Sequence, residues 1–183
     1  NRSANVLNEV FYAAYEEALG KLEQDESVTG VILTSAKKLF MAGADIDRAF
    51  NSDDPAEFFE GSQRLKAHFR RLETLGKPVV AALNGTALGG GMELGLACHY
   101  RIALDNDRIK FGFPEVGLGL LPGAGGVART VRLAGMQKGL EWLAQNKKYT
   151  PKQALADGMI HELASDMGDM MAKAVAWIEA NPA

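Results

Sequence analysis

One stretch decides the fold of this chain: KPVVAALNGTALGGGMELGLACHYRIALDNDRIKFGFPEVGLGLLPGAGG, residues 77–126. It holds apolar runs at 78–83 and 100–104, each bounded by turn residues, which is the pattern of a buried strand. Between them, the glycines at 89–91 open an apolar segment that ends at Cys98. Glycine lets the backbone approach a ligand closely, and a helix start leaves N–H groups unpaired. The stretch therefore predicts two buried strands joined by a helix whose start can bind an anion.

Two glutamates belong to this stretch. Glu93 follows the three glycines and Glu115 follows Pro114, so both stand beside residues that expose the backbone. Each feature also has a purely structural reading: the glycines as a tight turn, Glu93 as a first-turn glutamate that answers the helix dipole, and Glu115 as a surface charge. Their combination within one stretch predicts an active site.

Composition narrows the class of protein. A length of 183 residues, with 47% apolar and 23% charged, suits one globular domain with a sizeable core. A net charge of −3 without a basic block argues against nucleic acid as a partner.

Cys98, the single cysteine, reads as a buried hydrophobe, and the three histidines lack ligand spacing, so no metal site is predicted. Without a span of roughly 20 apolar residues or a secretory signal, the expected compartment is the bacterial cytoplasm or an organelle matrix.

The remaining elements are read from periodicity and from helix start and stop signals. Proline after Asp54 and after Thr150 marks helix starts, and Gly158 marks a helix end. Leu140 and Leu143 are expected to face inward. Residues 159–163 are predicted to be an apolar connector. A strand is predicted at 28–34 and further helices at 5–24, 54–75, 127–133, 136–145, 150–158 and 168–181.

Four motifs occur in a fixed order: LFMAGADI at 39–46, KPVVAALNGTALGGGMELGLAC at 77–98, FGFPEVGLGLLPGAGG at 111–126 and TPKQALADG at 150–158. Together they resemble the crotonase (enoyl-CoA hydratase/isomerase) superfamily over essentially the whole chain. The resemblance implies an α/β fold, the ClpP/crotonase spiral of repeated ββα units with surrounding helices. Within the superfamily the chain is most similar to the amino-terminal hydratase domain of multifunctional fatty-acid β-oxidation proteins. Residues 1–183 are thus expected to be a crotonase-like domain and a fragment of a longer chain.

The resemblance also implies roles for single residues. Members of the superfamily bind an acyl-CoA thioester and hold its carbonyl oxygen with two backbone N–H groups, which here belong to Ala44 and Gly90. Glu93 and Glu115 match the two hydratase glutamates, with Glu115 exchanging the proton at C2 and Glu93 holding and activating the water. The implied substrate-binding residues are Ala42, Ala44, Asp45, Ile46, Asp47, Leu88 and Gly90. Apolar candidates for the acyl pocket, each also readable as core, are Met41, Phe50, Phe58, Phe59, Leu88, Met92, Phe113 and Leu118.

These roles favour an enoyl-CoA hydratase, because the related Δ3-Δ2-enoyl-CoA isomerase needs one proton shuttle and generally lacks one of the two glutamates. The isomerase and a non-catalytic crotonase-fold module that binds acyl-CoA or RNA remain the alternatives. A Rossmann enzyme is disfavoured by the glycine spacing, and a serine hydrolase by the absence of Gly-x-Ser-x-Gly. The interval from Glu93 to Glu115 is a residue or two longer than in typical relatives, around 105–110, a loop that can absorb an insertion.

The resemblance further implies no cofactor, since coenzyme A is part of the substrate and NAD would serve only a dehydrogenase domain after this chain. The expected partners are the acyl-CoA substrate and either further copies of the chain or a thiolase.

Overall fold

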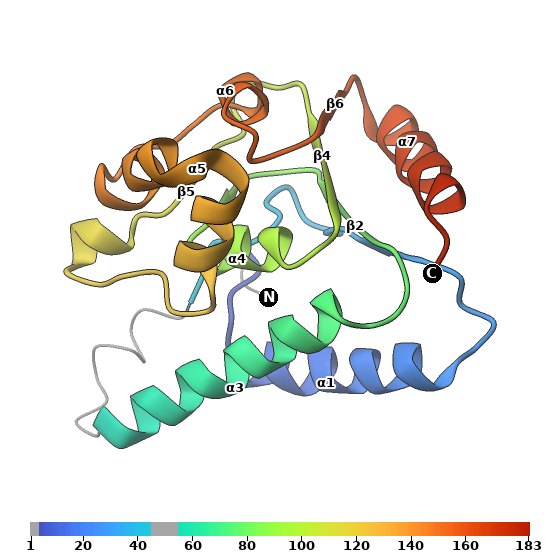
Figure 1. Cartoon of the computed structure of the whole chain (residues 1–183), viewed down its shortest axis with the longest axis horizontal. Helices are drawn as coiled ribbons and strands as arrows, with labels where there is room; N and C mark the ends of the chain where they lie inside the picture. Colours follow the sequence, from blue (N-terminus) through green and yellow to red (C-terminus); the bar gives the residue numbers. More distant parts are fainter. Residues whose placement is uncertain (1–3, 45–54) are drawn as a thin grey trace.

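The computed structural model describes residues 4–44 and 55–183 and has the mixed α/β class that the motifs predict (Figure 1). Its helices and strands follow one another as α1 (Glu9–Gln24), β1 (Val31–Leu33), α3 (Pro55–Glu73), β2 (Val79–Leu83), β3 (Ala87–Leu88), α4 (Gly90–Leu96), β4 (Tyr100–Leu104), β5 (Phe111–Gly112), the 3-10 helix η1 (Glu115–Leu118), α5 (Gly126–Ala144), α6 (Pro151–Ala156), β6 (Glu162–Ala164) and α7 (Met167–Ala180).

The main sheet is parallel, with strand order β1-β2-β4-β6, and β3 pairs with β5 in a second, two-stranded parallel sheet. Strand β2 is buried on both faces: Val79, Ala81 and Leu83 join the large core, while Val80 and Ala82 pack in a second cluster with α7. Because successive side chains of a strand point to opposite faces, a strand covered on both sides reads as a continuous apolar run. This explains the run at 78–83.

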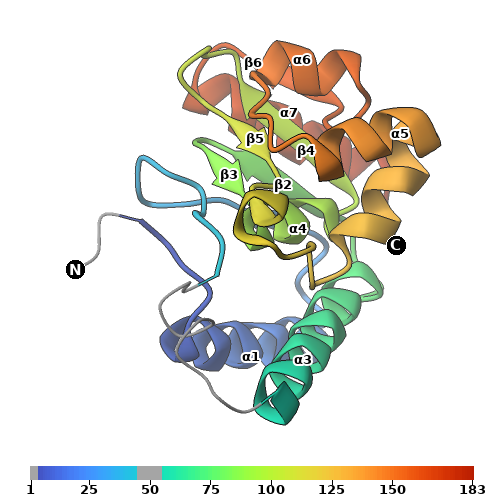
Figure 2. The same ribbon diagram turned by 90° about the vertical axis from the view of Figure 1, so that its left-hand side faces the viewer.

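Two pairs of helices lie at opposite ends of the molecule, with α4 and α5 between them (Figures 1 and 2). Helices α1 and α3 lie side by side at one end, and α6 and α7 lie at the other (Figures 1 and 2). Arg71 of α3 donates hydrogen bonds to Glu16 and Glu23 of α1, which ties the two helices together on their exposed side. The start of α4, where Gly90 and Gly91 are buried, lies between the sheet and the α1–α3 pair (Figure 1).

The first helix begins later than the predicted residue 5. The Asn8 side chain accepts the Phe11 N–H and caps α1, which begins at Glu9. The residues before this cap pair with a distant segment instead. The Leu7 N–H donates to the Gly43 carbonyl and the Ala42 N–H donates to the Asn5 carbonyl, both at 2.9 Å. The chain start thereby supports the segment that the resemblance places at the substrate.

Other boundaries also differ from the prediction. The prediction of a connector at 159–163 was wrong, because β6 begins at Glu162 and pairs with β4. Leu140 is 55% exposed and does not face inward, whereas Leu143 is buried. Gly135, with φ +77°, kinks α5 at the point where two separate helices were predicted. Cys98 is buried as expected but follows the end of α4. Asp54, the predicted cap of α3, lies outside the described residues.

None of the helices within 4–44 and 55–183 combines the length and the apolar character that crossing a bilayer requires.

Candidate active site

The glycines at 89–91 allow two backbone segments to meet. Gly89, the N-cap of α4, has φ +53°, in the left-handed region that favours glycine. A Cβ on Gly91 would collide with the carbonyl oxygen of Met41, which also accepts the Leu88 N–H at 3.1 Å. The segment at 41–44 therefore lies directly against the start of α4.

Ala44 and Gly90, the predicted oxyanion donors, are brought together there. A Cβ on Gly90 would lie 3.8 Å from the Ala44 nitrogen. Gly90 is the first residue of α4, so its N–H has no partner within the helix. In the bridge between Leu7 and Ala44, the Leu7 N–H is the donor, to the Gly43 carbonyl, and the Ala44 N–H takes no part. Within the described residues, two unpaired N–H groups thus lie near each other.

The other predicted substrate contacts are only partly described. Ala42 is exposed and Leu88 is half-buried beside Gly89, whereas Asp45, Ile46 and Asp47 lie outside the described residues. Among the pocket candidates, Phe59 and Leu118 are exposed; Met41, Met92 and Phe113 are buried in the core; and Phe50 and the side chain of Phe58 lie outside the description.

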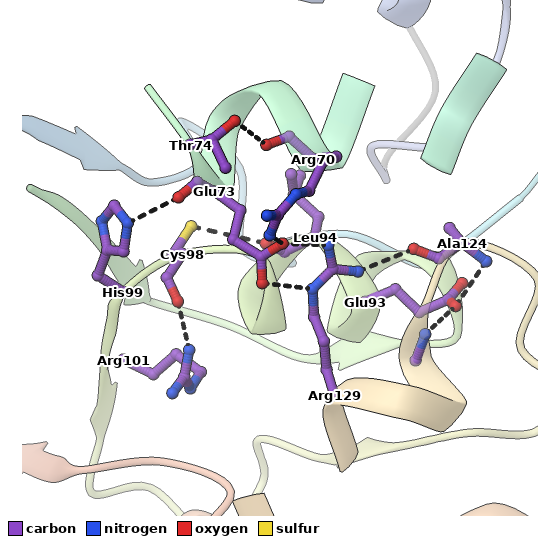
Figure 3. Close-up of polar contacts among 11 residues, drawn as sticks. Arg70, Glu73, Thr74, Glu93, Leu94, Cys98, His99, Arg101, Ala124 and Arg129 are labelled. Atoms are coloured by element: carbon purple, nitrogen blue, oxygen red, sulfur yellow. Dashed lines mark hydrogen bonds and ion pairs between the residues drawn. The ribbon is translucent and has the colours of Figure 1, made fainter. Parts of the chain in front are cut away.

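Glu93 is fixed by the start of α5. The residue is buried on α4, and its Oε1 accepts the N–H groups of Ala124 and Gly126, each at 2.7 Å (Figure 3). The N-cap of α5, Gly125, has no side chain to bond these donors, so the Glu93 carboxyl caps the helix instead. A Cβ on Gly126 would lie 2.8 Å from both Cγ and Oε1 of Glu93. The second glycine turn lets a helix start close around this carboxyl.

Glu115 lies over the other glycine turn. It begins η1 and is partly buried, and its Oε2 is buried without a hydrogen-bond partner among the residues described. A Cβ on Gly89 would lie 2.6 Å from its Oε1. The carboxyl of Glu115 therefore faces the N-cap of α4, one residue before Gly90.

The residues around 105–110 form a turn between β4 and β5, closed by the Ile109 N–H, which donates to the Asn106 carbonyl at 2.9 Å. The Lys110 N–H donates to the Thr86 side chain at 3.0 Å and holds the end of this turn on the chain before β3. Beyond this turn, Glu115 lies against the N-cap of α4.

The two carboxyls differ in what surrounds them. Burial, with a smaller effect from the charge of Glu93, raises the pKa of Glu115 to about 7, although its own backbone N–H acts in the opposite direction. Burial also raises the pKa of Glu93, while two backbone N–H donors and the charges of Arg129 and Lys66 oppose that rise. Hydrogen bonds and cations favour a charged carboxylate. Glu93 is therefore better equipped to be ionised, and Glu115 is better equipped to carry a proton.

Arg129 is a part of the site that the sequence did not predict. From α5 it donates to both carboxylate oxygens of Glu73 on α3 and to the carbonyl of Ala124 (Figure 3). A partner in another helix leaves no trace in local periodicity. A positive charge near a helix start is unfavourable because it opposes the helix dipole. The position of Arg129 close to the start of α5 is therefore the one local sign that it has a compensating partner elsewhere in the fold.

Comparison with known proteins places this geometry in a family. Residues 1–181 match the family model described as enoyl-CoA hydratase/isomerase. The chain is 42% identical over 162 residues to the fatty acid oxidation complex subunit alpha of Idiomarina loihiensis, covering 88% of this chain and 23% of that protein. The same subunit of Shewanella oneidensis is 41% identical over 160 residues, covering 87% of this chain and again 23% of the relative. The chain thus spans about a quarter of these relatives.

Solved structures agree with this result and with the predicted crotonase fold. An enoyl-CoA hydratase from Bacillus anthracis superposes with a TM-score of 0.88 at 30% identity, covering 98% of this chain and 69% of that one. A human mitochondrial delta3-delta2-enoyl-CoA isomerase gives a TM-score of 0.89 at 28% identity, covering the same shares. With a family match over nearly all its residues, the chain belongs to the enoyl-CoA hydratase/isomerase family.

Proposed function

We propose that this site adds water across the double bond of trans-2-enoyl-CoA thioesters in fatty-acid β-oxidation. The observation that carries the proposal is the pair of unlike carboxyls next to two unpaired N–H groups. Glu93 has two backbone donors and a nearby arginine, whereas Glu115 has a buried oxygen with no partner in the described part of the chain. Hydration needs a base for water and an acid for carbon, and two carboxyls in different environments divide that work.

The first step takes place at C3. The thioester oxygen accepts the N–H groups of Ala44 and Gly90, and the Glu93 carboxylate accepts a proton from a water molecule. As that O–H bond breaks, the water oxygen bonds to C3, and the C2–C3 π pair moves toward the carbonyl to give an enolate. Fixed N–H donors stabilise the growing negative charge without reorganising.

The second step takes place at C2. The enolate re-forms the carbonyl as C2 takes the proton of Glu115, which leaves Glu115 ionised and Glu93 protonated. Exchange of protons with solvent restores the pair for the next cycle. A pKa near 7 for Glu115 suits this step, because a general acid works best when its pKa lies near the operating pH.

The decisive experiment follows the loss of the conjugated thioester absorbance of crotonyl-CoA and of a longer 2-enoyl-CoA. Glu93→Gln and Glu115→Gln keep the shape of each side chain and remove its acid–base chemistry. We expect each to lower kcat by about 10²–10⁴-fold, the usual value of a positioned acid or base.

The outcomes separate the alternatives. A parent protein that converts cis-3-enoyl-CoA to the 2-enoyl isomer faster than it hydrates crotonyl-CoA is an isomerase, a possibility that the likeness to the human isomerase supports. A parent protein that binds acyl-CoA and turns over neither substrate is a binding module. Either result overturns the hydratase proposal.

The oxyanion donors need a separate pair of variants, because a Cβ on Gly90 would collide with the Leu7 side chain. Leu7→Ala/Gly90→Ala opens that space and keeps the Gly90 N–H, whereas Leu7→Ala/Gly90→Pro removes the N–H. We expect kcat of the proline variant to fall about 10²–10³-fold below that of the alanine variant, as for the loss of one oxyanion donor. Equal rates in the two variants would contradict a role for Gly90.

The assembly and the compartment are extensions of this proposal. The named relatives are alpha subunits of a fatty acid oxidation complex, which supports a thiolase subunit or further copies of this chain as partners and the bacterial cytoplasm as the compartment. The reaction written above requires no metal or redox cofactor. Across 4–44 and 55–183, no cluster of His, Cys, Asp or Glu side chains is arranged to hold a metal ion.

A further inference from the structure

The guanidinium of Arg129 joins two parts of the molecule. Its side chain is 11% exposed; Nε and Nη2 donate to the two carboxylate oxygens of Glu73 at 3.2 and 3.1 Å, and Nη1 donates to the Ala124 carbonyl at 3.1 Å. Figure 3 shows this fork between the end of α3 and the turn that leads into α5. Such a planar group holds three acceptors at once in a fixed geometry.

The turn that Arg129 holds is the one that holds Glu93. Ala124 accepts Arg129 through its carbonyl and donates its N–H to Glu93 Oε1 at 2.7 Å. Gly125, between the two donors to Glu93, has φ +100°, and a Cβ there would collide with the guanidinium. A glycine turn has many accessible conformations. The guanidinium packed on it restricts these conformations to the one that points two N–H groups at a single oxygen.

Glu73 is itself fixed at the end of α3. Its Oε2 also accepts Arg70 at 2.7 Å, and its backbone carbonyl accepts the Nε2–H of His99 at 3.0 Å. His99 must donate from Nε2, since its Nδ1 accepts the Val79 N–H. The anchor of Arg129 is thereby tied to the start of β2 as well as to α3.

The Glu73–Arg129 ion pair alone would be enough to hold α3 against α5. The third hydrogen bond of Arg129, to the Ala124 carbonyl, is not needed for that purpose and holds the turn before α5. We propose that Arg129, anchored by Glu73, is a positioning residue that fixes the turn at 124–126 and, through it, the orientation of the Glu93 carboxylate toward water. This inference rests on the hydratase proposal, because the role of Glu93 as base belongs to that proposal.

The test compares Arg129→Lys with Arg132→Lys. Lysine at 129 keeps the positive charge but cannot bond Glu73 twice and Ala124 at once. Arg132 is exposed on the same helix and serves as the matched control. With crotonyl-CoA we expect kcat of Arg129→Lys to fall about 10–100-fold, as for a misplaced catalytic group, with KM little changed. Arg132→Lys should match the parent protein.

A second readout separates positioning from folding. The ¹³C signal of the Glu93 carboxyl, followed by NMR against pH, reports its pKa in each variant. Glu93 is faced by Arg129 from α5, Lys66 from α3 and Glu115 from η1, and Arg129→Lys conserves all three charges. Weaker N–H bonds to Glu93 should therefore raise its pKa in Arg129→Lys and leave it unchanged in Arg132→Lys.

The inference is overturned if Arg129→Lys keeps kcat within about twofold of the parent, or if the loss merely follows the unfolded fraction. Should Arg129→Lys not fold, the double variant Glu73→Gln/Arg129→Gln takes its place with the same expected loss of kcat; it removes both charges of the pair and leaves only the largely exposed Arg70 without its Glu73 partner. An inert parent protein defeats the hydratase proposal alone. In that case a raised Glu93 pKa in the variant still supports positioning, and an unchanged pKa rejects it.

Discussion

The two glycine turns of the site treat their carboxyls in opposite ways. At 124–126 the turn offers two N–H groups to Glu93, each 2.7 Å from one oxygen. At 89–91 the turn faces Glu115 and offers it no hydrogen bond, and Oε2 of Glu115 stays buried without a partner among the described residues. Similar backbone chemistry thus produces one carboxyl held by two N–H donors and one with an oxygen that has no partner among the described residues.

The difference supports the division into an acid and a base that the proposed hydration requires. Burial raises the pKa of both carboxyls, but two N–H donors from the start of α5 and the charge of Arg129 oppose that rise at Glu93, whereas the nearby charge of Glu93 adds to it at Glu115. The N–H of Gly90, in the turn beneath Glu115, has no partner among the described residues, and in the proposed reaction it bonds the substrate oxygen. Under the proposed function, each turn binds one negative charge, a carboxylate in one case and an oxyanion in the other.

The largest effect is expected from Gly89→Ala, which acts on Glu115. The new Cβ would lie 2.6 Å from Oε1 of Glu115 and would displace this acid. We expect kcat for crotonyl-CoA hydration to fall about 10²-fold, the effect of a displacement near 1 Å. Gly76→Ala is the control, since Gly76 has a similarly left-handed φ of +74° and open space around it. Equal losses in both variants would point to backbone strain instead.

On the side of Glu93 the corresponding change is Gly126→Ala, whose Cβ would lie 2.8 Å from Cγ and Oε1 of Glu93. Because Glu93 keeps the Ala124 N–H as an anchor, we expect a smaller loss of kcat, about 10–100-fold. Gly123→Ala in the same turn has its nearest neighbour at 3.5 Å and should stay close to the parent rate. A larger loss for Gly126→Ala than for Gly89→Ala would reverse the proposed ranking.

The pH dependence of kcat/KM sharpens the comparison. The proposed hydration needs Glu115 protonated, and its pKa of about 7 means that this form is lost as the pH rises through that value. We therefore expect kcat/KM to fall above pH 7, approaching about tenfold per pH unit. The residual activity of Glu115→Gln should lack this alkaline limb. A limb that persists in Glu115→Gln belongs to another group.

The smallest expected effect is on stability. A folded-state pKa raised from 4.5 to about 7 stabilises the fold fully below pH 4.5, and this contribution is lost as the pH rises through 7. Glu115→Gln removes the group that causes this loss. The change in the free energy of unfolding that it produces should therefore be about 1–2 kcal/mol more favourable at pH 8 than at pH 4.5, after allowing for partial solvent access. Urea unfolding at the two pH values measures this difference, and an equal change at both would contradict it.

Much of the fold could be predicted because its signals are local. The apolar run at 78–83 is continuous since both its faces are buried, and Thr150 caps α6 through a capping box with Gln153. Strand β6 was missed because three residues cannot display a period. It is a strand through its pairing with β4. Leu140 was misplaced because the inward face of its helix carries Gly139, Trp142 and Leu143, and a periodic pattern does not say which side of an apolar stripe meets the core.

The candidate site, like the fold, could be predicted only in part. The motifs predicted four site residues, Ala44, Gly90, Glu93 and Glu115. In the structure Ala44 lies near Gly90, and Glu115 lies against the turn at 89–91. The bond between Glu73 and Arg129 joins residues 56 positions apart, and neither residue belongs to a pattern that names the other. Long-range polar pairs of this kind depend on how helices pack, which a single sequence does not record.

The pairing of the chain start with the segment at 42–44 has a consequence for the order of folding. The Ala44 and Gly90 donors meet only when three stretches, at 5–7, 41–44 and 88–91, are in place together. Contacts between distant stretches carry a large loop-closure cost and tend to form late. The sheet and its helices can thus collapse first, and we expect the oxyanion donors to be among the last groups to assemble on folding and the first to separate on local opening.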